Sequence, residues 1–537
     1  MNNGRNHQTC DVAIIGAGPQ GLMYASWLKR AAPALRVIIL ERHHSPRHKI
    51  GESTLSGYCK AMRAQGISHR AMQRLFFPKN GLGFFYGTRY QGELVESPEY
   101  IIEAFDETFQ VERRPLEILL MENAKRYGVE LVLGAKVDVK ASTFAKTGCT
   151  LRYSLNDESA TLDARLVVDA SGPASILARH FDLYGEGSMV SGFQTHSVWA
   201  YFKNVKWLDD YQGWQKNAMH PRDQYTQHVY FREGWMWYIP IRSWQHVPDS
   251  VMSELSRRII ADGDAPFTDP RNPSREVTFE QIWSIGLVIR EDRDIALKHG
   301  PAATFAHYAR EVPLIAKVLE GAEMIDGHYN GHNPYGIRRN IHHHCKQAAG
   351  DGWLLLGDAA FFVDPLASPG LTGGVAASYL AHQLTLKALE RNDMSRESFA
   401  EYDTLCRELY QALEREIENI YLGFNHPKAL EVIMRLQEID GRRHFATHAE
   451  KEYGIDDFNV WGILYPEYQE LQKGAWNLMR EGEKEAALST PIGEQDYQQY
   501  ENNAEQLSEF LGPYISEHIG LTPYCENNRG ANLHPES

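Results

Sequence analysis

Short, continuous apolar runs mark the first half of this chain. Residues 11–15 and 37–40 are two such runs, and residues 22–29 between them place apolar side chains at helical spacing. Residues 167–168 and 354–356 repeat the continuous apolar pattern much later in the chain. Runs of this kind are typical of strands that are buried on both faces of a helix-covered parallel sheet. The pattern therefore predicts an α/β fold.

The remaining segments follow two other patterns. Between 191 and 345 the chain is rich in strand-like runs, among them 198–202 and 279–287. The most unusual is GWMWYIP at 234–240, where Trp235 and Trp237 occupy the same face of a strand. Pro240 lacks an amide hydrogen and is expected to end the ladder there. After residue 393 the periodicity is helical, and it predicts helices over 402–422, 427–439, 456–479 and 497–510.

A nucleotide-binding fingerprint follows the first strand. GAGPQG at 16–21 stands between a strand and a helix, and the second strand ends at Glu41. Glycines at these positions let the backbone approach a pyrophosphate, and the helix start supplies amide donors and a positive dipole. Glu41 can accept hydrogen bonds from ribose hydroxyls, as in FAD or NAD. We therefore interpret the first region as a Rossmann-type dinucleotide-binding domain.

The order of later segments favours FAD. Arg113 precedes an apolar helix pattern, the run 167–168 leads into Asp169 and Gly172, and the run 354–356 leads to Asp358 before a long helix. This order resembles the FAD-binding domain of aromatic hydroxylase-like flavoproteins. We expect a FAD-binding domain at 10–190, with an insertion at 55–110 that carries Lys79, followed by a strand-rich substrate domain at 191–345. The chain is expected to return to the FAD-binding domain at 346–392 and to end in a helical C-terminal region at 393–526 and a flexible tail at 527–537.

Four segments give a more specific resemblance. GWMWYIP at 234–240, GESTL at 51–55 and FVDPLASPG at 362–370 are similar to motifs of the flavin-dependent halogenases. Lys79 lies after GESTL at about the distance of that family's essential lysine. The Asp-Pro form of the third motif and the GAGPQG opening look more like the phenol- and pyrrole-halogenating branch. Without this resemblance Lys79 would read as a surface lysine.

The resemblance implies a function. Reduced FAD (FADH2), oxygen and chloride or bromide would yield hypohalous acid, which Lys79 would deliver to an electron-rich phenol or pyrrole in secondary metabolism, such as antibiotic biosynthesis. A separate NAD(P)H-dependent flavin reductase is the expected partner, and the small aromatic substrate is either free or tethered to a carrier protein. Expected cofactor contacts come from Gly16, Gly18, Gly21, Glu41, Glu52, Ser53, Arg113, Asp169, Gly172, Asp358, Pro365 and Gly370. Halide is expected at Ser368, Gly370 and Leu371, and the wall between flavin and substrate at Trp235, Trp237, Ile239 and Pro240.

Two residues depart from the family pattern. Ser56 replaces a usual proline after GESTL, and Pro369 replaces a residue whose amide would hold the halide. A flavin-dependent monooxygenase or oxidase of an aromatic substrate therefore stays open as an alternative. A non-catalytic flavin-binding protein is a third interpretation, which Lys79 together with a full flavin site opposes.

Composition limits the other possibilities. The chain has 537 residues, of which 43% are hydrophobic and 23% charged, and a net charge of −15 that argues against nucleic acid and anionic membrane surfaces. Six scattered cysteines and the absence of an apolar leader or an 18-residue apolar run favour a cytoplasmic protein. His342–His344 are consecutive and are not expected to converge on a metal. Trp461 and Trp476 are interpreted as core residues.

Overall fold

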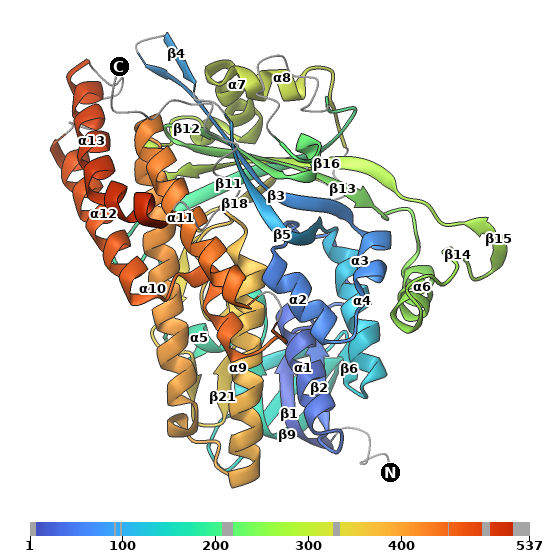
Figure 1. Cartoon of the computed structure of the whole chain (residues 1–537). Helices are drawn as coiled ribbons and strands as arrows, with labels where there is room; N and C mark the ends of the chain where they lie inside the picture. The colour runs from blue at the N-terminus through green and yellow to red at the C-terminus, as the bar shows by residue number, and fades with distance from the viewer. Residues whose placement is uncertain are drawn as a thin grey trace.

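Two large sheets and a column of C-terminal helices form the molecule. The computed structural model describes residues 7–90, 93–96, 99–206, 218–325, 333–448, 451–485 and 494–518. The first sheet lies at the bottom of Figure 1 and the second at the top, with the C-terminal helices along one side of both. The predicted α/β class with a Rossmann-type sheet, a strand-rich part and a helical C-terminal region is confirmed. The predicted flexible tail, 527–537, lies outside the described residues.

The first sheet contains the predicted nucleotide-binding strands. Its order is β20-β21-β9-β1-β2-β6, with β8 paired to β9 and β7 to β8. The pairs that join β21, β9, β1, β2 and β6 are all parallel. The bounds are β1 (His7–Ile15), β2 (Val37–Glu41), β6 (Glu130–Leu133), β7 (Lys136–Thr143), β8 (Cys149–Leu155), β9 (Glu158–Asp169), β20 (Ala349–Gly350) and β21 (Trp353–Leu355).

Helices cover this sheet and join it to the rest of the molecule. The helix α1 (Pro19–Ala31) packs on β1 and β2 and also contacts α4 (Arg113–Arg126) and α9 (Pro369–Arg391). Val12, Ile14 and the neighbouring apolar residues of β1 and β2 are fully buried beneath α1. The return of the chain at β21, predicted from its apolar run, places the start of α9 at the carboxyl end of the sheet. Ligands bind at this end of open α/β sheets.

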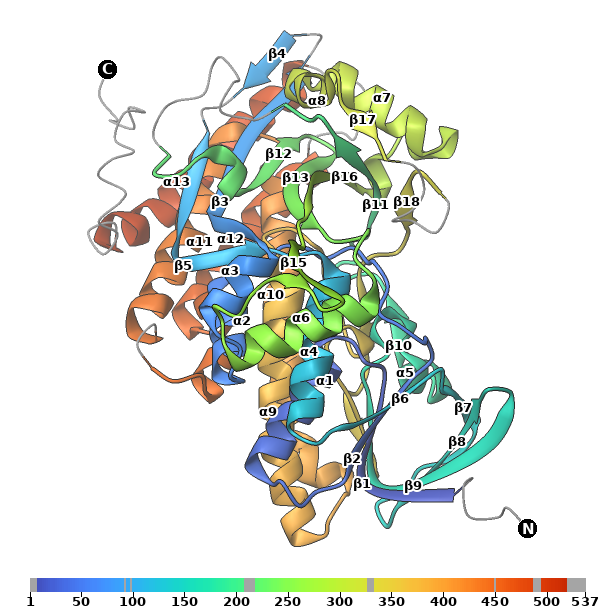
Figure 2. The same cartoon turned by 90° about the vertical axis from the view of Figure 1, so that its right-hand side faces the viewer.

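The second sheet combines the insertion with the strand-rich region. Its order is β17-β11-β16-β13-β12-β3-β4, with β18 on β11 and β5 on β3. Figure 2 shows it above the first sheet, with α7 and α8 on its outer side. The bounds are β3 (Phe77–Tyr90), β4 (Glu93–Glu96), β5 (Tyr100–Gln110), β11 (Thr195–Lys203), β12 (Thr226–Phe231), β13 (Gly234–Ser243), β16 (Glu280–Arg290), β17 (Glu323–Met324), β18 (Gly336–Arg338), α7 (Pro301–Glu311) and α8 (Pro313–Leu319).

The strand β13 divides its side chains between two cores. Trp235, Trp237 and Ile239 face the main core, whereas Met236 and Tyr238 face a smaller core beneath α7 and α8. The prediction that Pro240 ends the strand is wrong, since β13 continues to Ser243 against β16. Pairing with β12 does stop at Tyr238, so Pro240 lies where the strand has lost one neighbour. A residue without an amide hydrogen is tolerated at such an edge.

The C-terminal helices cover one side of both sheets. The helices α10 (Ala400–Gly423), α11 (Pro427–His448), α12 (Pro466–Glu485) and α13 (Glu494–His518) pack in the pairs α10–α12, α11–α13 and α12–α13. The predicted helix over 456–479 is wrong in its first part, because Trp461 and Gly462 have φ values of 40° and 85°. Left-handed residues cannot continue an α-helix, and after the short 3-10 helices Ile455–Phe458 and Val460–Gly462 the α-helix begins only at Pro466.

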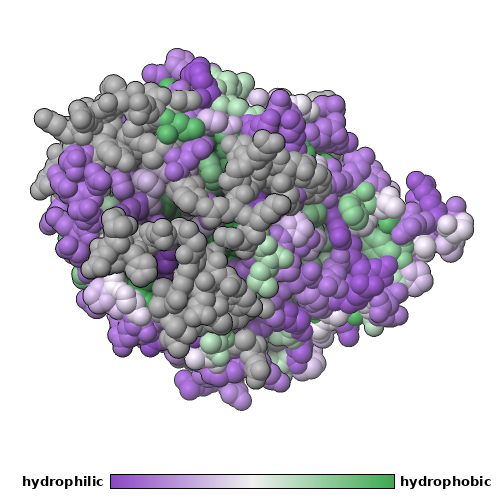
Figure 3. Space-filling view, turned by 45° about the horizontal axis from the view of Figure 1, so that its top comes forward, coloured by the Kyte–Doolittle hydropathy of each residue, from purple (hydrophilic) through white to green (hydrophobic). Residues whose placement is uncertain are grey.

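The remaining elements are short. They are α2 (Ser56–Ala64), α3 (His69–Leu75), α5 (Ile176–His180), α6 (Asp249–Ala261), β10 (Tyr184–Glu186), β14 (Thr268–Asp269), β15 (Asn272–Glu276) and β19 (His343–Cys345). On the face shown in Figure 3, hydrophilic residues cover much of the described surface and hydrophobic residues form small separate patches. Within the described ranges, none of the helices combines the length and the apolar character needed to cross a membrane.

Candidate active site

The glycine-rich loop lies between the ends of β1 and β9. A Cβ on Gly16 would lie 2.5 Å from the carbonyl oxygen of Ala170, so only glycine allows this approach. A Cβ on Gly18 would meet nothing within 4 Å, which leaves open space at the start of α1. The carboxylate of Glu41 accepts the amides of Ala17 and His43, both at 2.9 Å. Loop, helix start and acid are therefore arranged as a dinucleotide site requires.

Asp169 and Gly172 shape the neighbouring turn. Asp169 is fully buried, and its two carboxylate oxygens accept the amides of Ser171 and Leu177 at 2.8 Å each. Burial raises the pKa of Asp169, and these amide donors oppose that rise. Gly172 has a φ of 65° and open space in front of it. Through these contacts Asp169 would act on a cofactor by holding the backbone turn.

A cavity lies where the two sheets meet, and we call it the tryptophan cavity. It brings together eleven predicted site residues from five segments of the chain. They are Glu52, Ser53, Arg113, Trp235, Trp237, Ile239, Asp358, Pro365, Ser368, Gly370 and Leu371. Pro240 has the opposite phase on β13 and is not among the lining residues. The remaining predicted cofactor residues, Gly16, Gly18, Gly21, Glu41, Asp169 and Gly172, lie outside the lining, and Glu41 borders a separate small cavity.

Polar groups in the tryptophan cavity fit a flavin. The Nε of Arg113 is buried and has no hydrogen-bond partner among the described residues, while its terminal nitrogens donate to Ile50 and Glu117. Burial raises the pKa of Asp358, and the charge of Arg338 opposes that rise. The Arg113 guanidinium, with its unpartnered Nε, and the Asp358 carboxyl group can form hydrogen bonds with the ring and the ribityl hydroxyls of FAD.

Glu52 connects the cavity to the tryptophans. Its carboxylate accepts the hydroxyls of Tyr201 at 2.7 Å and Ser284 at 3.2 Å, and the indole of Trp237 donates to Ser284 at 3.0 Å. Burial raises the pKa of Glu52 to about 7, although the two hydroxyls oppose the shift. Trp235 donates to the Tyr421 hydroxyl at 2.9 Å, so both indoles are held in fixed orientations.

The predicted halide residues surround the start of α9. Pro369 is the first residue of this helix, where its missing amide breaks no helical hydrogen bond. The amide of Ser368 donates to the carbonyl of Pro365 at 3.0 Å, and Ser368 has a left-handed φ of 63°. The amides of Gly370 and Leu371 belong to the first turn, which has no intrahelical acceptor for them. Two of the predicted backbone donors are therefore available to an anion.

Lys79 is buried, with only 1% of its surface exposed. On β3, Lys79 pairs with Thr108 of β5 and Gly81 pairs with Glu103. The four residues 104–107 of β5 therefore lie opposite the single residue Asn80, which makes a bulge in β5. This bulge brings β5 so close that a Cβ on Gly81 would lie 2.1 Å from the Ile102 carbonyl oxygen. Bulges re-aim side chains and are common beside active sites. Burial lowers the pKa of Lys79 to about 7.

Lys79 lines a second cavity, which we call the lysine cavity. Its Nζ donates to Ser53 Oγ and to the carbonyl of Thr54, both at 2.7 Å. Ser53 lines the tryptophan cavity, so these contacts lie between the two cavities. The walls of the lysine cavity are mostly apolar and include Leu55, Leu82, Ile102, Ala104, Ala367, Val460, Phe445 and Trp461. Trp461 and Trp476, both interpreted as core residues, pack against the core. Trp461 in addition lines the lysine cavity, whereas Trp476 lines neither cavity.

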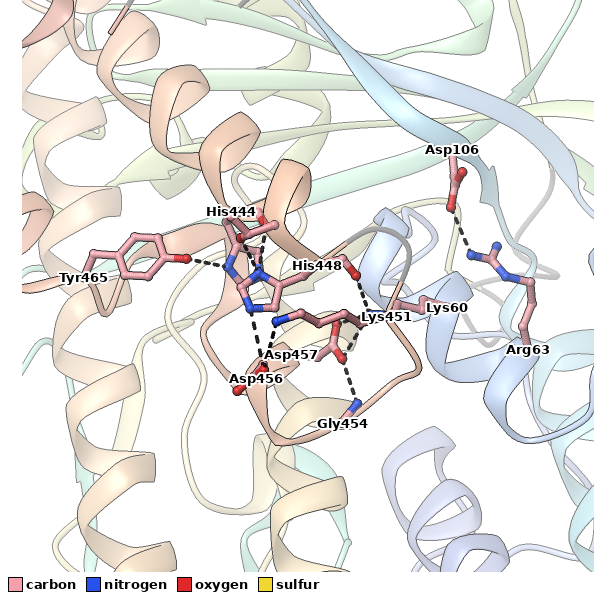
Figure 4. Close-up of polar contacts among 11 residues, drawn as sticks. Lys60, Arg63, Asp106, His444, His448, Lys451, Gly454, Asp456, Asp457 and Tyr465 are labelled. Atoms are coloured by element: carbon pink, nitrogen blue, oxygen red, sulfur yellow. Dashed lines mark hydrogen bonds and ion pairs between the residues drawn. The ribbon is translucent and has the colours of Figure 1, made fainter. Parts of the chain in front are cut away.

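The C-terminal region supplies the far wall of the lysine cavity. Figure 4 shows His444 of α11 and Asp457 of the following loop, both of which line the cavity. Lys60 of α2 ties this loop down by donating to Asp457 at 2.9 Å and to the carbonyl of His448 at 3.0 Å. Burial lowers the pKa of His444 to about 4, so its ring is neutral at pH 7.

Several site residues escaped the sequence reasoning. Thr226, His228, Arg338 and Phe362 line the tryptophan cavity, and Gln437, Glu438 and Arg442 line the lysine cavity. His228 lies six residues before the tryptophan segment and pairs with Trp237 in the same sheet. Its closeness to that segment in the sequence is the one feature that could have indicated a site residue. No local pattern distinguishes the residues of α11 from those of any amphipathic helix.

Comparisons with known proteins agree with this geometry. Residues 9–258 match the family "FAD binding domain". A protein from Malbranchea aurantiaca, "Flavin-dependent halogenase malA", is 28% identical over 86% of this chain and 73% of its own length. A Pseudomonas fluorescens "1H-pyrrole-2-carbonyl-[peptidyl-carrier protein] chlorinase" is 24% identical over 74% of this chain and 80% of its own. The crystal structure of halogenase PltM with phloroglucinol and FAD shares the fold, with a TM-score of 0.75 at 19% identity, over 96% of this chain and 99% of that one.

Proposed function

We propose that this chain is an enzyme of the flavin-dependent halogenase family, since it is similar to a protein of that name over 86% of its length and matches a FAD-binding domain, and that it halogenates an electron-rich aromatic ring through Lys79. One observation carries the proposal. The amine of Lys79 is buried between a cavity lined by the predicted flavin and halide residues and a second, apolar cavity. A lysine at this boundary can receive an oxidised halogen from one side and present it to a substrate on the other.

The residues of the tryptophan cavity and of the glycine-rich loop would have separate roles. Reduced FAD bound there would supply, with oxygen, the oxidising equivalent that converts chloride or bromide into hypohalous acid. The glycine loop and Glu41 would hold its nucleotide half, and Arg113 and Asp358 its flavin half. The amides of Gly370 and Leu371, at the positive end of the α9 dipole, would hold the halide.

Trp235, Trp237 and Ile239 would keep the substrate away from the flavin. Their side chains are buried and form a dry wall, which shields a small oxidant from water. Lys79 then holds hypohalous acid in one of two ways. Its neutral amine can take the halogen while the hydroxide and one N–H proton leave as water, or its ammonium can donate a hydrogen bond to the oxygen. An aromatic carbon attacks the halogen, and the ring afterwards loses a proton.

The lysine cavity suits an aromatic ring. Most of its surface is apolar, and Phe445 and Trp461 are among the residues that line it. We propose a phenol or pyrrole as the substrate, in secondary metabolism. The relatives include enzymes named for carrier-tethered pyrroles and for tetracycline, so both free and carrier-bound forms belong in the test. We further propose that a separate NAD(P)H-dependent reductase supplies reduced flavin, since the chain has one dinucleotide fingerprint. Rapid reduction of bound FAD by NAD(P)H alone would contradict this.

Reconstitution tests the proposal. Purified protein, FAD, a flavin reductase, NADH and bromide are incubated with a panel of phenols and pyrroles, and products are identified by mass spectrometry. We expect halogenated product that disappears in Lys79→Ala, while FAD affinity and oxygen consumption persist because Lys79 does not line the tryptophan cavity. Lys203→Ala, which changes an exposed lysine on the same sheet, is the matched control. Comparable halogenation by Lys79→Ala would refute the role of Lys79.

A flavin monooxygenase or oxidase is the second candidate. It is favoured by the start of α9, where Pro369 has no amide and the Ser368 amide is already donated to Pro365. In the same assay, this candidate predicts hydroxylated or dehydrogenated product in halide-free buffer at the rate seen with bromide. Strict dependence on halide excludes it.

A further inference from the structure

The hydrogen bonds of Lys79 fix the direction of its nitrogen. Ser53 Oγ and the carbonyl of Thr54 each accept one N–H at 2.7 Å. A neutral amine has two N–H bonds, so both are used and the lone pair is left. An ammonium has three, so one N–H is left. Because Lys79 lines the lysine cavity, the remaining position of the nitrogen is the one available to that cavity.

Among the described residues no carboxylate forms an ion pair with Lys79, although Glu103, Glu438 and Asp457 line the same cavity. Among the groups that the structure describes, the charges that act on Lys79 or respond to it are those of Cys59 on α2 and His228 on β12. Burial raises the pKa of Cys59 to about 11 and lowers the pKa of His228 to about 3, so both are neutral at pH 7. The two oxygen acceptors are therefore the main polar groups that stabilise the charged form of Lys79.

Ser53 is itself held in place. Its hydroxyl is 2.8 Å from Thr226 Oγ1, which accepts a hydrogen bond from Gln110 Nε2 at 2.8 Å. Its backbone forms a bridge with Gln110, and Thr54 is bonded to Phe109 through its amide and its hydroxyl. Segment 53–54 is thus fastened to β5, the strand that pairs with β3 at Lys79.

We propose that Ser53 is the positioning residue for Lys79: its hydroxyl, with the Thr54 carbonyl, aims the third position of the nitrogen into the lysine cavity. This inference rests on the proposed function and adds a role to a residue that the sequence placed at the cofactor. It also predicts that the amount of free amine and the rate of halogenation change in opposite directions when the hydroxyl is removed.

The reason for these opposite changes is electrostatic. An acceptor stabilises an ammonium more than a neutral amine, so Ser53→Ala should lower the pKa of Lys79 by about one pH unit. More of the amine is then neutral at pH 7. Its direction is no longer fixed, and halogenation should fall about 10- to 100-fold. Ser53→Thr keeps the hydroxyl and should retain both properties.

The experiment measures the pKa of Lys79 without the cofactor. Protein lacking FAD is treated with trace acetic anhydride between pH 5 and 10, and acetylation of the Lys79 peptide is quantified by mass spectrometry. Ser378→Ala is the control, because Ser378 is a buried serine that donates to the Gly374 carbonyl and lines neither cavity. Ser53→Cys, with a weaker acceptor, is the second removal variant in case Ser53→Ala does not fold. Halogenation is measured separately and normalised to bound FAD.

Each outcome decides the inference. A lower pKa together with slower halogenation, rescued in Ser53→Thr, supports it. An unchanged pKa of Lys79 in both removal variants overturns the hydrogen bond between Lys79 and Ser53. A lower pKa of Lys79 with undiminished halogenation overturns the role of Ser53 in orienting Lys79. Failure of the proposed function is recognised independently of the acetylation experiment, because wild type would then form no halogenated product, or Lys79→Ala would halogenate as fast as wild type.

Discussion

Replacement of Lys79 by methionine should reveal the energetic cost of a buried amine. In the native protein burial lowers the pKa of Lys79 from 10.5 to about 7. At 1.36 kcal/mol per pH unit, this difference corresponds to about 5 kcal/mol of destabilisation when the amine is charged. Methionine has a similar length and carries no charge, so the variant avoids this cost. It also loses two hydrogen bonds, to Ser53 and Thr54.

The sign of the effect follows from proton binding. Below pH 7 the amine is charged in both folded and unfolded chains, and the native state carries the full cost. Between pH 7 and 10.5 only the unfolded chain keeps the proton, so wild-type stability rises with pH relative to Lys79→Met. The free energy of unfolding of wild type minus that of the variant should therefore increase by about 4 kcal/mol from pH 7 to pH 10. The lost hydrogen bonds change the offset of this difference and leave its slope unaffected.

Urea unfolding of both proteins without FAD, at four pH values from 7 to 10, measures this slope. Lys203→Met is the control, because the exposed Lys203 forms an ion pair only at the surface. The difference in free energy of unfolding between wild type and Lys203→Met should therefore change little with pH. Equal pH dependence of wild type and Lys79→Met would refute the reasoning, because it would mean that Lys79 titrates in the folded protein as it does in water.

Three further predictions concern the halide, the cofactor and the substrate wall. Pro369→Ser adds an amide at the start of α9 and should lower the halide concentration required for half-maximal turnover about 10-fold; an unchanged requirement would place the halide elsewhere. Glu41→Ala removes the acceptor beside the glycine loop and should raise the FAD dissociation constant about 10- to 100-fold in a fluorescence titration, whereas unaltered affinity would contradict its role at the ribose. Trp461→Leu should raise KM for small aromatic substrates several-fold with little loss of oxygen consumption, and the same change at Trp476, outside both cavities, should not.

Local patterns in the sequence were sufficient for the first sheet. The strand, glycine loop, helix and acid from residue 11 to Glu41 form in the predicted order, because each depends on neighbouring residues and on the steric freedom of glycine. The alternation of GWMWYIP likewise determined that Trp235 and Trp237 share a face. Lys79 was identified through a motif spacing, and that spacing contains no information about its burial.

Other properties depend on contacts between distant parts of the chain. Pro240 continues a strand because β16 remains beside it after β12 has ended, which only the sheet order decides. The far wall of the lysine cavity comes from α11 and from Trp461, whose left-handed backbone interrupts a segment with helical periodicity.

The sequence by itself determined which residue types carry the chemistry and which short elements present them. Only the tertiary structure decided the environment of Lys79, because its pKa and its direction are set by groups that are remote in the chain. Ser53 lies 26 residues before Lys79, and Thr226 lies 173 residues after Ser53. Desolvation and hydrogen-bond geometry are properties of the packed surroundings, and they arise when the bulged β5, the segment 53–54 and the second sheet close around one amine.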